Sequence, residues 1–355
     1  MGSITYWLCF SQKTKQPEQV NTPVITENDL KQFISTLKTL LLISTIISVM
    51  MGVYGLKLLL TRYSGWAGYL TVGGSIRADV VSEKFQIPTV VPLGILITII
   101  SCVFGGIFLA FTRKSLAFVP IISVILFTLV LLGRILIIYA IVIYFVTFIL
   151  IGYYYNRRSF LKARYVVLAI LILVIFFVVV AEIRGGLAMS EEFKYSNVKY
   201  TPVNHYMLRL MHYLIGGIGA LDHFLFYRVD WLNVDFGLNN LEPITKYQFG
   251  EHDFHYYFIQ TPVLTNIFTF FKQIIDDFSI FGITIYPFLL GNIVTAIYIQ
   301  TIEKKKITYL ILLIFLYLYL ANSLIISINI YTSVLFGAII SIIIMNFLFK
   351  YYHMA

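Results

Sequence analysis

Long apolar runs recur along the sequence, and each is close to the length that a helix needs to cross a bilayer. A transmembrane helix takes about 17 to 25 apolar residues, and 59% of this chain is hydrophobic against 12% charged. The runs lack the alternation of lipid-facing strands. We therefore predict an all-α, polytopic integral membrane helix bundle of about eight spans, near residues 39–60, 90–111, 116–133, 135–155, 165–183, 279–302, 307–322 and 330–349.

Basic residues are concentrated in short connections at alternate ends of these runs. Cytoplasmic loops carry such an excess of Lys and Arg. We therefore expect both termini in the cytoplasm, with residues 1–38 as an N-terminal tail and residues 39–350 as a single membrane domain. The basic clusters are Lys13 to Lys38, Arg113 with Lys114, Arg157 to Arg164, Lys304 to Lys306, and Lys350.

The segment 184–278 is the one large connection on the opposite side. It contains five of the six histidines and more acidic than basic residues. Polar, titratable side chains are what general acid–base chemistry requires. We therefore predict that this segment is a largely helical outer-face loop and that any reaction takes place there.

Several classes of function fit the sequence poorly. Transporters place ionisable residues and helix breaks at the middle of the membrane, whereas these spans are nearly free of charge. His252 and His255 have no evident third ligand, so we expect neither a metal nor another cofactor. The basic residues lie beside spans rather than in a separate domain, and we therefore expect no nucleic-acid partner.

Three arginines lie where the expected spans meet the outer surface: Arg77, Arg134 and Arg184. The planar guanidinium group suits phosphate oxygens because it donates two parallel hydrogen bonds. Snorkelling to the interface is the alternative explanation for each of them. Arg184 is the strongest candidate for phosphate binding, because two glycines follow it and allow close backbone approach to a ligand.

The outer segment also contains a helical pattern over residues 200–230, with His205, Arg209, His212 and Asp222 among apolar residues. An amphipathic helix on the membrane surface accounts for the pattern. Aromatic residues mixed with Asn, Asp, Glu and Gln follow it. This mixture suits a carbohydrate, although an interfacial aromatic belt has a similar composition.

The stretch TNIFTFFKQIIDDFSIFG, residues 265–282, joins the outer segment to an apolar run. We expect a helix that begins near Asn266, follows the surface and turns into the bilayer at Phe278. Lys272 and Asp276 then share one helix face and pair. Asp277 lies on another face, where it either caps the helix or holds an arginine or a sugar hydroxyl.

Four motifs together resemble bacterial O-antigen or capsule repeat-unit polymerases of the Wzy type. They are GR at 133–134, RGG at 184–186, YLIGGIGALDHF at 213–224, and TNIFTFFKQIIDDFSIFGITIYPFLLG at 265–291. The last is the most specific, through Asn266, Thr269, Asp277, Phe278 and Gly282. The resemblance covers roughly residues 40–350. The chain departs from the family in one respect, because family members commonly have more spans than the eight predicted here.

The resemblance implies a metal-independent glycosyltransferase of the bacterial inner membrane. Its donor and acceptor are oligosaccharides linked to undecaprenyl pyrophosphate, joined at the periplasmic or outer face, with a chain-length regulator and a flippase as further partners. From their own chemistry, Arg184 and Arg77 are expected to stabilise the pyrophosphate, and His252 with its acidic neighbours is the preferred base. The other candidate bases are His205, His212, Glu251 and Asp253. The expected substrate-binding residues are Arg134, Arg209, His205, His212, Asn266 and Asp277.

Two other functions use related substrates. An O-antigen ligase takes the same donor and passes the glycan to the lipid A core. A lipid-linked oligosaccharide flippase is a transporter, and it needs a polar path through the membrane that these spans do not supply.

Overall fold

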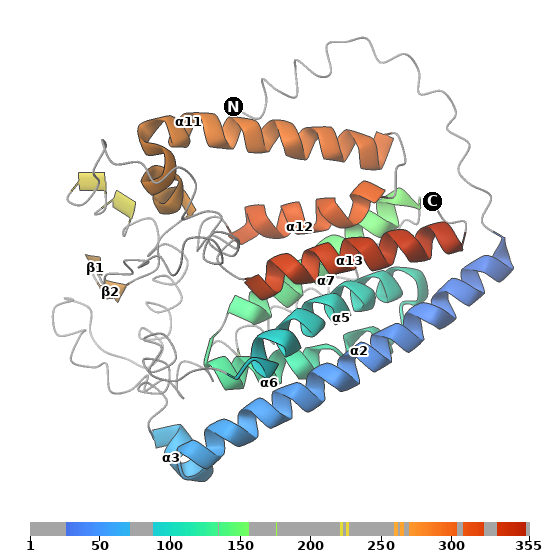
Figure 1. Ribbon diagram of the computed structural model, residues 1–355. Coiled ribbons are helices and arrows are strands. Elements are labelled where there is room, and N and C mark those ends of the chain that lie inside the picture. The colour runs from blue at the N-terminus through green and yellow to red at the C-terminus, as the bar shows by residue number, and fades with distance from the viewer. Residues whose placement is uncertain are drawn as a thin grey trace. The chain divides into compact units, whose positions relative to one another are not determined.

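The computed structural model describes most of the expected spans (Figure 1). The described residues are 26–71, 88–133, 135–155, 259–261, 263–265, 270–303, 308–322 and 332–352, with residues 175, 221–222 and 225–226. Nearly all regular structure among them is helical, as predicted. Five helical segments are long and apolar enough to cross a membrane: Glu27–Arg62, Val90–Thr112, Ile135–Gly152, Phe281–Thr301 and Ser333–Tyr351.

These five segments correspond to the predicted spans 39–60, 90–111, 135–155, 279–302 and 330–349. They belong to helices α2 (Glu27–Arg62), α5 (Val90–Thr112), α7 (Ile135–Tyr154), α11 (Phe270–Tyr298) with the π-helical turn η3 (Ile299–Glu303), and α13 (Thr332–Tyr351). The chain is therefore a helical protein with several segments suited to a membrane. Apart from residue 175, the predicted span 165–183 lies outside the described residues.

Two of the predicted spans are shorter helices. The run 116–133 divides into η1 (Ser115–Phe118) and α6 (Ile121–Leu131). Pro120 lies between them, and Leu132 ends α6 in the left-handed region at φ 47°. The run 307–322 forms α12 (Thr308–Asn322), whose strongly apolar part covers Tyr309–Leu320.

The described helices belong to two compact units. The core unit contains α2, α3 (Gly65–Thr71), α5, η1, α6 and α7, together with α12 as far as Phe315 and α13 from Phe336. The α11 unit contains α11, η3, the strands β1 (Ile259–Thr261) and β2 (Val263–Thr265), α12 from Leu316 and the start of α13.

The strands β1 and β2 form an antiparallel hairpin in which Ile259 pairs with Thr265. The predicted outer segment is therefore not wholly helical. The β-branched residues Ile259, Thr261, Val263 and Thr265 favour extended backbone. Pro262 between the strands also disfavours a helix, because it lacks an N–H donor and restricts the residue before it.

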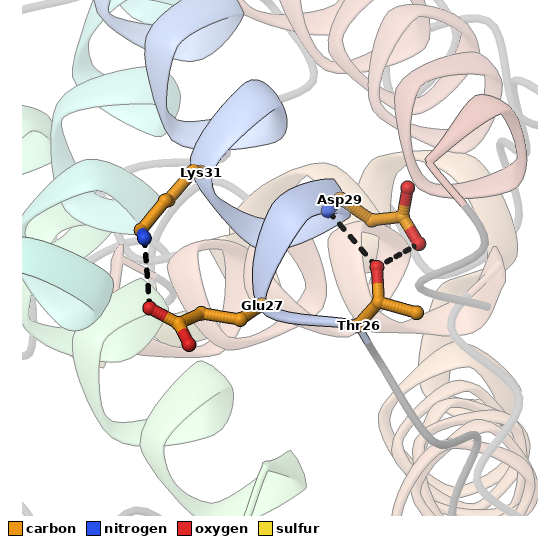
Figure 2. A network of polar contacts seen from close by, with 4 residues as sticks. All are labelled: Thr26, Glu27, Asp29 and Lys31. Carbon is orange, nitrogen blue, oxygen red and sulfur yellow. Dashed lines mark hydrogen bonds and ion pairs between the residues drawn. The ribbon is translucent and has the colours of Figure 1, made fainter.

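Helix α2 begins at Glu27, so the predicted boundary of the tail at residue 38 lies inside this helix. Thr26 is the N-cap, and its Oγ1 accepts a hydrogen bond from the backbone N–H of Asp29 at 3.1 Å (Figure 2). Lys31 and Glu27 form an ion pair one turn apart, at 2.8 Å. The Thr-x-x-Asp pattern is a variant of the capping box. The two acids in the first turn also stabilise the helix, because their negative charge lies near the positive end of the helix dipole.

Small residues allow α2, α5 and α6 to pack closely. A Cβ at Gly94 of α5 would lie 2.2 Å from the ring of Phe127 on α6 and 3.0 Å from Met51 on α2. Ser48 of α2 donates to the carbonyl of Gly94 at 3.1 Å and also hydrogen-bonds Thr98. Helices in a bilayer associate through such close packing and interhelical hydrogen bonds, because lipid gives them little hydrophobic driving force.

An aromatic cluster joins the ends of three helices in the core unit. Phe33 of α2 lies 5.4 Å from Phe349 of α13 and 5.6 Å from Phe111 of α5 between ring centroids. Tyr352 packs against Phe33 and hydrogen-bonds Thr36 at 2.6 Å. Phe33 is fully buried, so this cluster fixes how the termini of α2 and α13 meet.

We predict that Phe33→Ala destabilises the protein by about 3–5 kcal/mol, because a buried ring leaves a cavity and loses several aromatic contacts. The measurement is the thermal unfolding midpoint of purified protein in detergent. Phe347→Ala is the matched control, because Phe347 is 67% exposed on α13. Equal losses for the two variants would contradict the assignment of Phe33 to the core.

Candidate functional site

Of the predicted catalytic and substrate-binding residues, Asp277 is described by the structure. It belongs to α11, in the stretch that carries the most specific part of the family resemblance. The others lie outside the described residues: Arg184, Arg77, His252, Arg134, Arg209, His205, His212 and Asn266. The candidate site is therefore built from Asp277 and its neighbours.

Helix α11 is interrupted at Ser279, which has φ 56° and ψ −152°. A short amphipathic segment, residues 270–278, precedes the break, and the apolar segment Phe281–Thr301 follows it. Figure 1 shows the short segment turned away from the long one. The sequence predicted a change of direction at Phe278, one residue from the observed break. We refer to residues 270–282 as the α11 elbow.

Lys272 and Asp276 form the predicted ion pair, with Nζ 2.6 Å from Oδ2. Their side chains are 13% and 23% exposed. Pairs of this spacing contribute about 0.3–0.5 kcal/mol on exposed helices. A lysine in the first turn is unfavourable, because its positive charge lies near the positive end of the helix dipole. The ion pair with Asp276 offsets this cost and holds the Lys272 side chain against the helix.

Asp277 is buried, with 0% of its surface exposed. A buried carboxylate is costly unless hydrogen bonds or opposite charges compensate for the lost water, and Asp277 does take part in interactions within the structure. Its charge also acts on the hydroxyl of Tyr286, farther along α11. The prediction that Asp277 and Asp276 occupy different faces agrees with their different burial.

The Tyr286 hydroxyl is hydrogen-bonded to the Tyr319 hydroxyl of α12, at 2.8 Å. Both tyrosines belong to the α11 unit. Together with Asp277 they place a carboxylate and two phenolic hydroxyls along one part of α11 and α12. Sequence reasoning missed the two tyrosines, because single aromatic residues in apolar runs are not distinguishable from interfacial ones.

Ser279 and Gly282 determine the shape of the elbow. Positive φ with ψ near ±150° is strained for residues other than glycine, and such strain is concentrated at functional sites. Gly282 packs on the preceding segment, since a Cβ there would lie 2.7 Å from the carbonyl oxygen of Ile274. Ser279 gives no sequence signal for such backbone, whereas Gly282 was among the motif residues.

The elbow has the chemistry to orient another polar group. A buried carboxylate accepts hydrogen bonds from a guanidinium or from a sugar hydroxyl. Asp277 lies just before the apolar segment Phe281–Thr301 rather than within it. Within the described residues, no group of three or more His, Cys, Asp or Glu side chains is arranged to hold a metal ion.

Comparison of this chain with protein-family models, curated proteins and solved structures gave no match. The resemblance to repeat-unit polymerases therefore depends on the sequence motifs, and the role of the elbow depends on its own geometry.

We predict that Gly282→Ala costs about 1–3 kcal/mol, because the new methyl group overlaps the backbone of Ile274 and forces the two segments apart. Gly291→Ala on the same helix is the control, since a Cβ there meets nothing within 4 Å. Thermal unfolding in detergent measures both. A loss confined to Gly282→Ala supports the close approach, and equal midpoints for the two variants contradict it.

We predict that Ser279→Gly raises stability by about 1 kcal/mol, because the strain removed, about 1–3 kcal/mol, exceeds the entropic cost of a glycine, about 0.5–1 kcal/mol. Ser279→Ala keeps the strain and serves as the comparison. The same unfolding assay decides between them. If the glycine variant proves no more stable than the alanine variant, Ser279 is not strained in the folded protein.

Proposed function

We propose that this protein polymerises oligosaccharide repeat units linked to undecaprenyl pyrophosphate, by glycosyl transfer at the outer face of the bacterial inner membrane. The observation that carries the proposal is the α11 elbow. It places the buried Asp277 where a short amphipathic helical segment meets an apolar one of membrane-spanning length. The motif that most resembles the polymerase family lies in this same stretch.

The proposed reaction breaks the bond between the anomeric carbon of the donor glycan and its pyrophosphate oxygen. A hydroxyl oxygen of the acceptor sugar forms the new glycosidic bond and loses its proton to a base. The carrier leaves as undecaprenyl pyrophosphate, whose negative charge needs stabilisation as it develops. Arg184 and Arg77 are the proposed stabilising groups, with Arg134 and Arg209 as further contacts.

Asp277 has a positioning role in this proposal. A buried carboxylate fixes the orientation of a guanidinium or hydroxyl that it hydrogen-bonds, and correct orientation of reacting groups is worth several powers of ten in rate. His252 is the proposed base, and His205, His212 and Asn266 are proposed to bind the glycan. No step in this scheme requires a metal ion.

The test is complementation of a bacterial strain that lacks its own repeat-unit polymerase, with the surface glycan analysed on a gel. We expect wild type to restore a ladder of polymer lengths. Arg184→Ala is expected to leave a single repeat unit, because the loss of one charge stabiliser lowers the rate about 10²- to 10³-fold. Asp277→Asn keeps the shape but removes the charge, with an expected loss of about 10²-fold.

Asp276→Asn is the matched control, because it removes the neighbouring carboxylate and its part-buried pair with Lys272. It is expected to retain the full ladder. Immunoblots of the membrane fraction confirm equal amounts of each variant. A full ladder from Asp277→Asn or Arg184→Ala would contradict the role assigned to that residue.

Two further strains test the other functions. In a strain that keeps its polymerase but lacks its ligase, transfer of finished polymer to the lipid A core only when this protein is present identifies a ligase. In a strain that lacks its flippase, repeat units that reach the outer face only when this protein is present identify a flippase. Either result overturns polymerisation, and so does a wild-type protein that produces no ladder.

A further inference from the structure

A groove of about 450 Å³ lies near the C-terminal end of α2, in the core unit. Its described lining comprises Val53, Leu56, Lys57, Leu60, Thr61 and Gly65. The first five follow the i, i+3, i+4, i+7, i+8 pattern along α2 and so share one helix face. Lys57 is the one charged residue in this lining, and three apolar side chains surround it along the helix.

The adjoining helix α3 has exposed apolar side chains next to its corner with α2. Trp66 and Leu70 of α3 are exposed at 52% and 53% of their surface. Tyr69 between them is buried, and its hydroxyl donates to the carbonyl of Leu129 in α6 at 2.5 Å. Burial also raises the pKa of the Tyr69 phenol, which keeps the hydroxyl protonated as a donor.

The hydrogen bond from Tyr69 fixes α3 against the last turn of α6, where helix carbonyls lack partners within their own helix. Trp66 and Leu70 then face outward. Tryptophan is enriched where headgroups meet acyl chains, since its ring has an apolar body and a polar N–H. The chain turns between α2 and α3 at Ser64 and Gly65, both with positive φ. Lys57 is one to two turns of α2 from this corner.

We propose that the groove binds one anionic phospholipid of the surrounding bilayer. Its phosphate contacts the ammonium group of Lys57, and an acyl chain lies along Val53, Leu56 and Leu60. The space beside Gly65 is open, since a Cβ there would meet nothing within 4 Å, and it leaves room for the headgroup. One ammonium matches the single net negative charge of a lipid such as phosphatidylglycerol, whose headgroup has no cation to neutralise the phosphodiester.

Charge separates this occupant from the proposed substrate. A prenyl pyrophosphate carries more negative charge than a phosphodiester, and its recognition is expected to require several cations. The groove uses none of the residues that are assigned to the polymerase reaction. Either proposal can therefore fail without the other.

Trp66 reports on the groove directly. The chain has three tryptophans, and Trp7→Phe with Trp231→Phe leaves Trp66 as the only one. The full-length protein in detergent micelles is titrated with dibrominated phosphatidylglycerol or dibrominated phosphatidylcholine, whose bromines quench nearby tryptophan fluorescence. We expect half-maximal quenching at about fivefold lower mole fraction of the anionic lipid, the preference that one basic residue confers at a membrane surface.

Lys57→Gln is expected to abolish this preference, and Lys57→Arg to retain it. Lys38→Gln is the matched control, because Lys38 is exposed on the same helix and outside the groove. Thermal unfolding verifies that each variant is folded. Equal quenching by both lipids in the parent, or a preference that survives in Lys57→Gln, overturns the proposal.

A competition experiment tests the occupant. Unlabelled phosphatidylglycerol is expected to reverse the quenching at a lower mole fraction than farnesyl pyrophosphate. If farnesyl pyrophosphate reverses it at a tenfold lower fraction instead, the groove is a prenyl pyrophosphate site and the phospholipid assignment is wrong.

Discussion

A bilayer offers no water to backbone N–H and C=O groups, and this constraint governs the architecture of the chain. A segment that crosses the membrane must satisfy its own hydrogen bonds as a helix. The long helices α2, α5, α7 and α13 meet this requirement without a break inside their apolar windows. Helix α11 meets it differently, because its break at Ser279 precedes the apolar segment Phe281–Thr301.

The position of that break explains how a buried carboxylate is accommodated. Asp277 would be costly in the middle of a membrane span, whereas the α11 elbow places it just outside the apolar window. The elbow combines this buried charge with strained backbone at Ser279 and a close helix approach at Gly282. Strain maintained by close packing is typical of sites that hold a group in one orientation. These physical features support the proposed positioning role.

Within the core unit, small and hydroxylated residues replace the hydrophobic driving force that lipid removes. Gly94 of α5 leaves space for the ring of Phe127, and the Ser48 hydroxyl donates a hydrogen bond to the Gly94 carbonyl. Beyond the C-terminal end of α2, the Tyr69 hydroxyl of α3 donates a hydrogen bond to the carbonyl of Leu129 near the end of α6. These contacts hold the corner between α2 and α3, so the Lys57 groove lies on a supported surface.

The sequence by itself determined the helical class, the location of the five long apolar helices and the Lys272–Asp276 pair. These features depend on residue type and on spacings of a few residues. Long apolar runs and the known geometry of a helix allow both to be predicted from the sequence. The start of α2 was also readable from Thr26 and Asp29, although the length of the apolar run alone placed it at residue 39. Of the candidate site, the sequence identified Asp277 and Gly282 through their place in the motif.

Tertiary structure decided the features that depend on residues far apart in the chain. The hydrogen bond between Thr36 and Tyr352 spans 316 positions, and the one between Tyr286 and Tyr319 spans 33. The burial of Asp277 and the backbone of Ser279 also required the fold. A serine or an aspartate has the same local preferences in many settings, and only the packing around it determines whether it is strained or removed from water.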